Sequence, residues 1–148
     1  MTWRPISFAL LLLGACGEIP KDPNGTLERI RVEKSFRVGL IASGRERAQA
    51  PRQKKMLDRL AAAVGASPLI EEDAAEPLLA RLETGDLDLV IGELAPKSPW
   101  EKRVTVIPQL GEQVTPKGHV HVVVAARHGE NAWISFLHRE ARAIAAAP

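Results

Sequence analysis

The chain has 148 residues, 45% of them hydrophobic, and a formal net charge of +2, from 20 lysines and arginines against 18 aspartates and glutamates. This balance gives no case for nucleic acid as a partner, since nucleic-acid-binding domains carry a clustered excess of basic residues. The length suits one domain with a sizeable core, and a single cysteine excludes a disulfide within the chain.

Residues 1–15 have the pattern of a secretory signal peptide. Residues 1–5 (MTWRP) carry one basic side chain, and residues 6–15 (ISFALLLLGA) carry no charge. The apolar run is too short to cross a bilayer, which takes about 20 helical residues. A basic start, a brief apolar stretch and small residues at its end are typical of a segment that is removed on secretion.

The single cysteine, Cys16, directly follows this run. The tetrapeptide Leu-Gly-Ala-Cys at residues 13–16 resembles a bacterial lipobox, in which the thiol receives a diacylglycerol and the new amino terminus an N-acyl chain. We therefore expect a lipid on Cys16, no other cofactor, and an envelope protein that is anchored in a membrane and faces the periplasm. Residues 16–25, mostly polar with two prolines, would form the tether. The alternative is a signal peptide cut elsewhere, with Cys16 an incidental core residue.

The folded part begins with strand and helix patterns. Residues 35–43 (SFRVGLIAS) are a short apolar, β-rich run that predicts a buried strand. Residues 53–66 (QKKMLDRLAAAVGA) repeat apolar side chains at helical spacing, and Gly65 is the expected stop. Residues 67–73 (SPLIEED) predict a short second strand.

A second helix and strand follow. Asp73 and Glu76 have the spacing of a capping box, and apolar residues continue at helical spacing until Gly85. Residues 87–91 (LDLVI) predict a strongly apolar strand, and residues 98–103 (SPWEKR) predict one helical turn. Strand and helix patterns thus alternate through this part of the chain.

The last part of the chain predicts two strands and a closing helix. Residues 104–108 (VTVIP) indicate a short strand, residues 109–118 (QLGEQVTPKG) a loop, and residues 119–127 (HVHVVVAAR) a clear strand. Residues 131–147 predict a helix with a mostly apolar face. That face consists of Trp133, Phe136, Leu137, Glu140, Ala141 and Ile144.

Strands alternating with helices predict an α/β fold, a three-layer sandwich whose mixed, mostly parallel sheet is flanked by helices. In such sheets ligands lie beyond the carboxyl ends of the strands. We call this edge of the sheet the rim. Ser43, Arg45 and residues 93–98 follow predicted strands, so we expect them at the rim.

Four stretches carry a resemblance to a known family. Residues 25–43 look like its opening strand, and residues 76–95 (EPLLARLETGDLDLVIGELA) are similar to its helix–strand unit. Residues 98–110 lie where the family has a Thr-x-x-Arg turn before a strand, and residues 119–144 resemble its closing strand and helix. Together they resemble periplasmic solute-binding proteins of the amino-acid-binding type, which feed membrane transporters.

That family has two lobes that close on a solute, and this chain has the length of one. The resemblance implies a single-lobe domain over residues 26–148, with residues 109–118 in place of the second lobe. It also implies a small polar or anionic solute, with Arg103 the nearest candidate for the family's carboxylate-binding arginine. A lobe that cannot close leaves its solute open to water, so we expect low affinity. The proposed ligand-binding residues are Ser43, Arg45, Glu93, Ser98 and Arg103.

Three other patterns have simpler interpretations. Residues 39–44 (GLIASG) have the glycine spacing of a phosphate-binding loop but lack the Lys and Ser or Thr that follow it, so we interpret them as a strand end. His119 and His121 point to one face of a strand, and without an evident third ligand we interpret them as ordinary histidines. The basic run over residues 45–55 is either an ordinary solvated surface or a surface that attracts an anionic solute or lipid headgroups.

The sequence offers no catalytic set, since Cys16 carries the lipid and no Gly-x-Ser-x-Gly elbow occurs, so we expect no enzyme. It predicts a membrane-anchored, solute-binding-like lipoprotein that binds a small polar solute or serves as accessory subunit of a membrane transporter. The alternative is an interaction or structural lipoprotein that keeps the lobe as a docking scaffold. A common cavity around the proposed ligand-binding residues favours solute binding, and their separation favours docking.

Cys16→Ser is expected to block lipidation, because a hydroxyl does not replace the thiol as nucleophile, and to leave an uncleaved or mislocalised precursor. Intact-mass analysis of membrane-extracted protein measures this. A mature wild-type form without acyl mass would refute the anchor.

Overall fold

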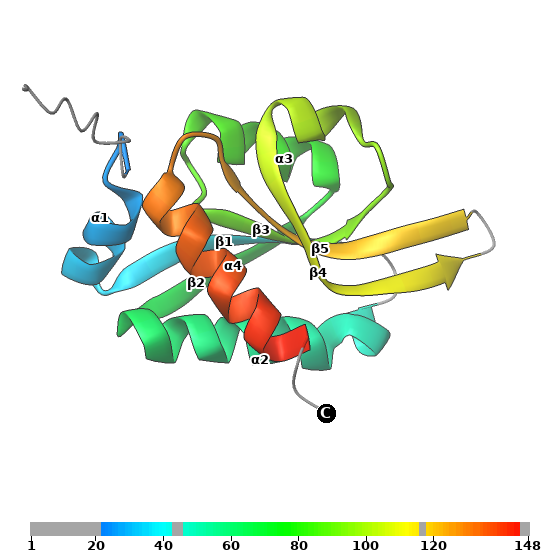
Figure 1. Cartoon of the computed structure of the whole chain (residues 1–148), viewed down its shortest axis with the longest axis horizontal. Coiled ribbons are helices and arrows are strands. Elements are labelled where there is room, and N and C mark those ends of the chain that lie inside the picture. The colour runs from blue at the N-terminus through cyan, green and yellow to red at the C-terminus, as the bar shows by residue number, and fades with distance from the viewer. Residues whose placement is uncertain (1–21, 43–45, 116–117, 146–148) are drawn as a thin grey trace, which may run out of the picture.

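The computed structural model describes residues 22–42, 46–115 and 118–145 (Figure 1). Strand and helix patterns alternate in these residues. The helices are α1 (Thr26–Glu33), α2 (Glu46–Val64), α3 (Ala75–Thr84) and α4 (Asn131–Ala145), with a short 3-10 helix, η1 (Pro99–Lys102). The strands are β1 (Ser35–Ile41), β2 (Ser67–Asp73), β3 (Leu89–Leu94), β4 (Val104–Thr115) and β5 (Gly118–Arg127).

These strands form one sheet in the order β2-β1-β3-β5-β4. β1 pairs in parallel with β2 and β3, whereas β5 runs antiparallel between β3 and β4. Of the described strands, β5 alone is reversed, and the others point the same way. The mixed, mostly parallel sheet predicted from the sequence is confirmed.

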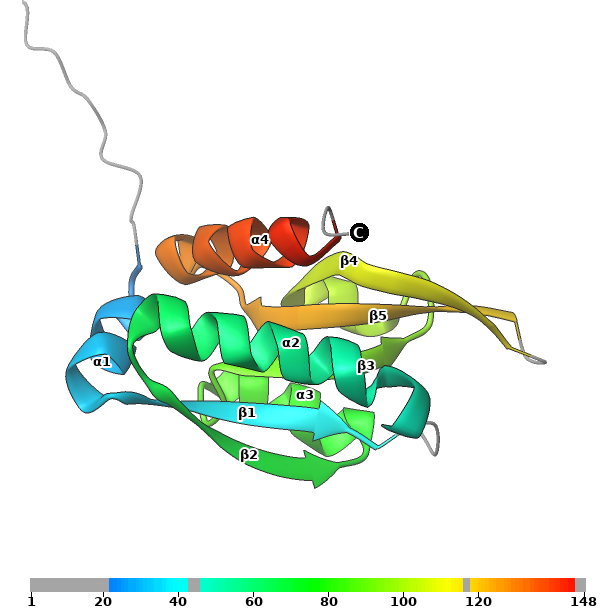
Figure 2. The same ribbon diagram turned by 90° about the horizontal axis from the view of Figure 1, so that it is seen from below.

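Helices cover both faces of the sheet (Figures 1 and 2). α2 and α4 pack on one face, where the core includes Met56 and Trp133. α3 and η1 pack on the other face, where the core includes Leu79 and Trp100. Successive side chains of a strand alternate between faces, so β5 contributes to both layers. Val122, Val124 and Ala126 join the α2 and α4 layer, and Val123 and Ala125 join the α3 layer.

Asp88, directly before β3, links several elements at the edge of the sheet opposite the rim, which we call the base. Its side chain is 2% exposed and pairs with Arg29 of α1 and with Arg37 of β1, whose Nη2 lies 2.8 Å from Oδ1. The Arg37 backbone N–H donates to Asp88 Oδ2 at 2.7 Å. Trp133 Nε1 of α4 donates to the Asp88 carbonyl oxygen at 2.8 Å. A buried carboxylate is tolerated when it is paired and hydrogen-bonded in this way.

Two expected helix starts are wrong. α2 begins at Glu46 and includes Pro51, because polar residues do not prevent a helix, although the proline removes one backbone donor. The capping box does not form, since Ala74 is the N-cap residue of α3. Asp73 Oδ1 accepts the Ala74 N–H at 2.7 Å, and Glu76 Oε1 accepts the Trp100 indole N–H at 3.0 Å.

The segment expected to be a loop, residues 109–118, is mostly strand. β4 runs to Thr115 and β5 begins at Gly118, and the register pairs these two residues. Beyond the pair of Leu94 with His121, the register of β5 continues with β4 and not with β3, so the two strands form a hairpin that projects past the sheet (Figure 2). In a hairpin, the backbone N–H and C=O groups of two adjoining segments bond to each other. The glycine and proline content of residues 109–118, which favoured a loop, does not exclude this pairing.

Asp88→Ala is expected to lower the free energy of unfolding by about 3 kcal/mol, because it removes the shared partner of Arg29 and Arg37. Asp86→Ala, at an exposed residue two positions earlier, is the control and should change this free energy by less than about 1 kcal/mol. Urea unfolding measures both variants. Equal losses in the two would contradict the role given to Asp88.

Candidate functional site

The rim is formed by the carboxyl ends of β1, β2 and β3, at Ile41, Asp73 and Leu94. β1 and β3 approach closely there, since a Cβ on Gly92 would lie 2.4 Å from the Cβ of Ile41. Glu93 is half-buried near the end of β3. Because neighbouring Leu94 is buried in the α3 layer, alternation turns Glu93 toward the face that α2 and α4 cover.

Ser98 lies close after the rim end of β3, whereas Ser43 and Arg45 lie outside the described residues. The Ser98 N–H donates to the Ala95 carbonyl oxygen at 3.2 Å, which closes a turn. The Ser98 Oγ accepts the Trp100 N–H at 3.4 Å and caps η1. Ser98 therefore shapes the turn that leaves the rim.

Arg103 lies at the base. It directly precedes Val104, which pairs with Arg127, whereas Leu94 at the rim pairs with His121. The strand length between these two pairs is about 20 Å at the usual rise per residue. Arg103 is therefore far from the rim end of β3.

The Arg103 guanidinium has partners at the base. Its Nε donates to Glu83 Oε1 at 3.0 Å and its Nη2 to Glu83 Oε2, and its Cζ lies 4.3 Å from the centre of the Trp100 ring. The hydrogen bond from Arg103 to the Glu83 carboxylate raises the pKa of Arg103 further above its ordinary value. The structure thus separates Arg103 from Glu93, whereas Ser98 and Arg103 flank η1 and both contact Trp100.

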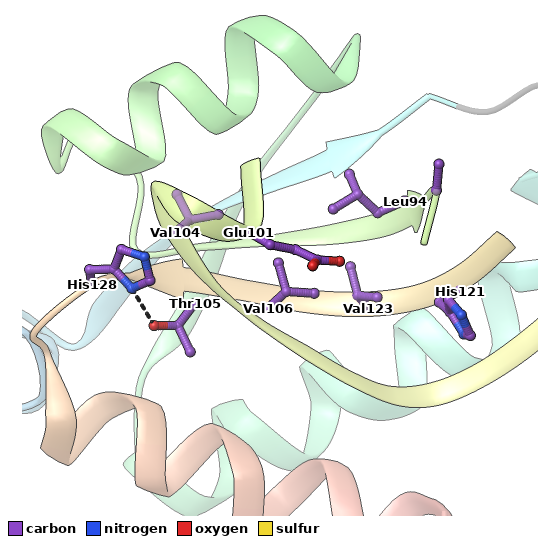
Figure 3. Close-up of a pocket in the computed structure, with 9 residues that line it drawn as sticks. Leu94, Glu101, Val104, Thr105, Val106, His121, Val123 and His128 are labelled. Carbon is purple, nitrogen blue, oxygen red and sulfur yellow. Dashed lines mark hydrogen bonds between the residues drawn. The ribbon is translucent and has the colours of Figure 1, made fainter. Parts of the chain in front are cut away.

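A pocket of about 380 Å³ lies on the sheet face that α3 covers, beside η1 (Figure 3). Valines of β4 and β5 form much of its wall. Glu101 of η1 extends over it, and His121 and His128 lie at its two ends. His128 Nδ1 lies 2.8 Å from Thr105 Oγ1. The sequence placed His121 on a strand face but gave no sign that Glu101 lines the same pocket. The register of the sheet, which the sequence pattern does not contain, brings η1 to the side of this pocket.

A second pocket, of about 350 Å³, lies between α2 and the outer strand β2, near the rim. Ile70 of β2 lines it and is 51% exposed, and Leu69 beside it is 57% exposed. Lys54, from the basic run, also lines this pocket and donates to Asp58 Oδ2 at 2.6 Å. This pair lies within α2 and has the spacing of a solvated helix surface.

Two carboxyl groups meet where the described chain begins. Glu130 is fully buried, and its oxygens accept the Asn24 N–H at 3.0 Å and the Thr26 N–H at 3.1 Å. Asp22 Oδ2 accepts the Leu27 N–H at 2.8 Å. Burial, together with the neighbouring Glu130 carboxylate, raises the pKa of Asp22 to about 6. Burial also acts to raise the pKa of Glu130, but the hydrogen bonds it accepts outweigh this and lower its pKa to about 2.

Comparison with known proteins identifies the fold. No family model and no curated protein sequence matches the chain. A solved structure of a phenylalanine-to-tryptophan mutant of the arginine-bound form of domain 1 from TmArgBP matches with a TM-score of 0.64 and 16% identity, over 80% of this chain and 97% of that one. The arginine-bound form of the same domain matches with a TM-score of 0.58 and 19% identity, over 78% and 97%. The chain has the fold of one lobe of a periplasmic binding protein.

The chain covers nearly the whole of both neighbours, each of which is a single domain in an arginine-bound form. Within residues 22–42, 46–115 and 118–145, no helix is long and apolar enough to cross a bilayer. The same residues contain no group of three or more His, Cys, Asp or Glu side chains that could hold a metal ion.

Asp22→Asn tests the carboxyl pair at the start of the lobe. Since the folded-state pKa of Asp22, about 6, lies above its ordinary value of 3.8, its ionisation weakens the fold as the pH rises from about 4 to 6. Asparagine keeps an acceptor for Leu27 and a donor for Glu130 without that ionisation. The variant should exceed the wild type in unfolding free energy by about 1–3 kcal/mol near pH 7.5 and not near pH 3.5. Urea unfolding at both pH values measures this difference. An equal gain in unfolding free energy at both pH values would contradict the raised pKa of Asp22 beside Glu130.

Proposed function

We propose that the protein is a non-enzymatic envelope lipoprotein, anchored by a lipid on Cys16, whose single lobe binds a small polar solute at the rim. The observation that carries the proposal is the likeness to one isolated domain in an arginine-bound form, of which this chain covers 97%. A lobe of this fold without a partner lobe is therefore a reasonable host for an amino acid. Delivery of the solute to a membrane transporter, as its accessory subunit, is part of the same proposal.

Glu93 is the described rim residue that we assign to the solute. Its carboxylate stands at the end of a buried strand and accepts hydrogen bonds from an ammonium or guanidinium group with the strength of a charged pair. The proposed site also includes Ser98 and, from outside the described residues, Ser43 and Arg45. Arg103 is not part of it, because its guanidinium binds Glu83 at the base.

The hairpin of β4 and β5 supports an open site. In the described residues these strands pair with each other where they extend past the rest of the sheet. A rim without a closing lobe leaves water in contact with the solute, and hydrogen bonds that compete with water contribute little net free energy. We therefore expect weak binding that a covering partner would strengthen.

Two observations favour the docking alternative. Neither of the two pockets described above is lined by Glu93, Ser98 or Arg103, and the outer strand β2 carries exposed apolar side chains. Leu69 and Ile70 are more than half exposed there, on a strand whose far edge pairs with no described strand. The acidic residues 71–73 that follow are typical of a sheet edge protected against pairing with another chain. This surface favours a side-chain contact rather than an added strand.

Glu93→Gln is the test of the rim site. Calorimetric titration of the lipidated chain in detergent with the common amino acids should give weak binding by the wild type. The variant should bind about 10- to 100-fold more weakly, since a hydrogen bond to a charged group contributes about 1.5–3 kcal/mol.

Glu101→Gln, in the pocket beside η1, is the matched control and should leave the affinity unchanged. A loss in Glu101→Gln but not in Glu93→Gln would move the site to that pocket and refute the rim. No heat with any amino acid in the wild type would refute solute binding and leave the docking alternative.

A further inference from the structure

The described chain enters the lobe at the base. Asp22 accepts the Leu27 N–H at 2.8 Å, and the N–H groups of Asn24 and Thr26 donate to Glu130. Glu130 is fully buried and follows the base end of β5. Figure 1 shows α1 and the β4–β5 hairpin at opposite ends of the molecule. Buried hydrogen bonds therefore fix the entry point at the end away from the hairpin.

Little chain lies between Cys16 and this entry point. Fully extended from Cys16 to Asp22, it spans at most about 22 Å. β1 alone separates base from rim by about 23 Å, and the 12 residues of β4 reach about 40 Å from the base. A lipid on Cys16 therefore cannot reach a bilayer on which the lobe stands by the tip of its hairpin, with the base uppermost.

The surface of α1 borders the entry point and suits lipid headgroups. Val32 is 71% exposed, and Arg31 and Lys34 beside it are also exposed. Basic side chains attract anionic headgroups, and an exposed apolar side chain enters the interfacial layer of a bilayer. Two acidic side chains of α1 lie beside these residues. Glu33 accepts a hydrogen bond from Arg29 at 2.8 Å, and the exposed Glu28 lies 4.0 Å from Arg31 Nη1, so both acidic charges are offset by arginines and Lys34 is the remaining basic side chain.

We propose that the lobe stands on the membrane with α1 and the base toward an anionic bilayer and with the rim and hairpin directed away from it. The inference rests on the proposed lipidation of Cys16, which supplies the anchor. A solute or protein partner then reaches the rim from the aqueous side. The rim does not meet a transporter surface that lies flush with the same bilayer.

Fluorescence quenching tests this orientation. The lipidated chain is placed in vesicles of phosphatidylethanolamine and phosphatidylglycerol that contain a lipid with a nitroxide headgroup. Because the lipid occupies the thiol of the one native cysteine, a thiol-reactive fluorophore labels the introduced cysteine and no other residue. The label on Glu28→Cys in α1 should be quenched several-fold more strongly than the label on Ala95→Cys at the rim.

Two controls separate the possible failures. A flexible insertion of about 20 Gly and Ser residues after Gly17 lengthens the tether without changing the lobe and should reduce the difference between the two labels. Vesicle flotation reports the anchor itself. Protein that floats with equal quenching at both positions, or with stronger quenching at the rim, overturns the orientation alone. Protein that does not float overturns the lipid anchor and the orientation with it.

Discussion

The buried carboxylate of Asp88 is the constraint on which the base of the lobe depends. Two arginines, from α1 and β1, and an indole N–H from α4 converge on this one residue. Each partner comes from a different element, so the position of Asp88 fixes α1, β1 and α4 relative to β3. Glu130, which follows the base end of β5, acts in the same way and holds Asn24 and Thr26 to the start of α4. The base is therefore the end of the lobe where buried charge fixes the geometry.

The rim end of the described strands has no fully buried carboxylate of this kind, and it is the end where we propose solute binding. Of its described polar residues, Glu93 and Ser98 are half-buried and Asp73 is exposed. Buried charge restricts a fold because each unpaired partner is costly, whereas half-exposed groups can exchange water for a solute. The two ends of the sheet therefore differ because the buried, paired carboxylates lie at the base.

The sequence predicts most of the fold because its strands and closing helix have strong periodic patterns. The helical face from Trp133 to Ile144 is buried as expected, and Gly65 and Gly85 end their helices in left-handed conformations. α1 escapes prediction since its eight residues are too few for a clear period. The site is less predictable, because Arg103 and Glu93 lie ten residues apart in the chain but at opposite ends of the sheet. That separation is set by the direction and register of β4, which a motif spacing does not contain.

The β4–β5 hairpin bears on which partner could cover the proposed site at the rim. In a two-lobed protein, closure of the second lobe removes water from the solute, so the protein itself provides the affinity for the solute. Here the two strands end in a hairpin, and nothing in the described chain closes over the rim. For the solute binding that we propose, strong retention then needs a surface outside the described residues that covers the rim. In the orientation that we propose, with a lipid on Cys16 and the base toward the bilayer, such a surface must reach the rim from above the bilayer. A protein domain that extends well beyond the membrane satisfies this requirement, and a flat membrane-level surface does not.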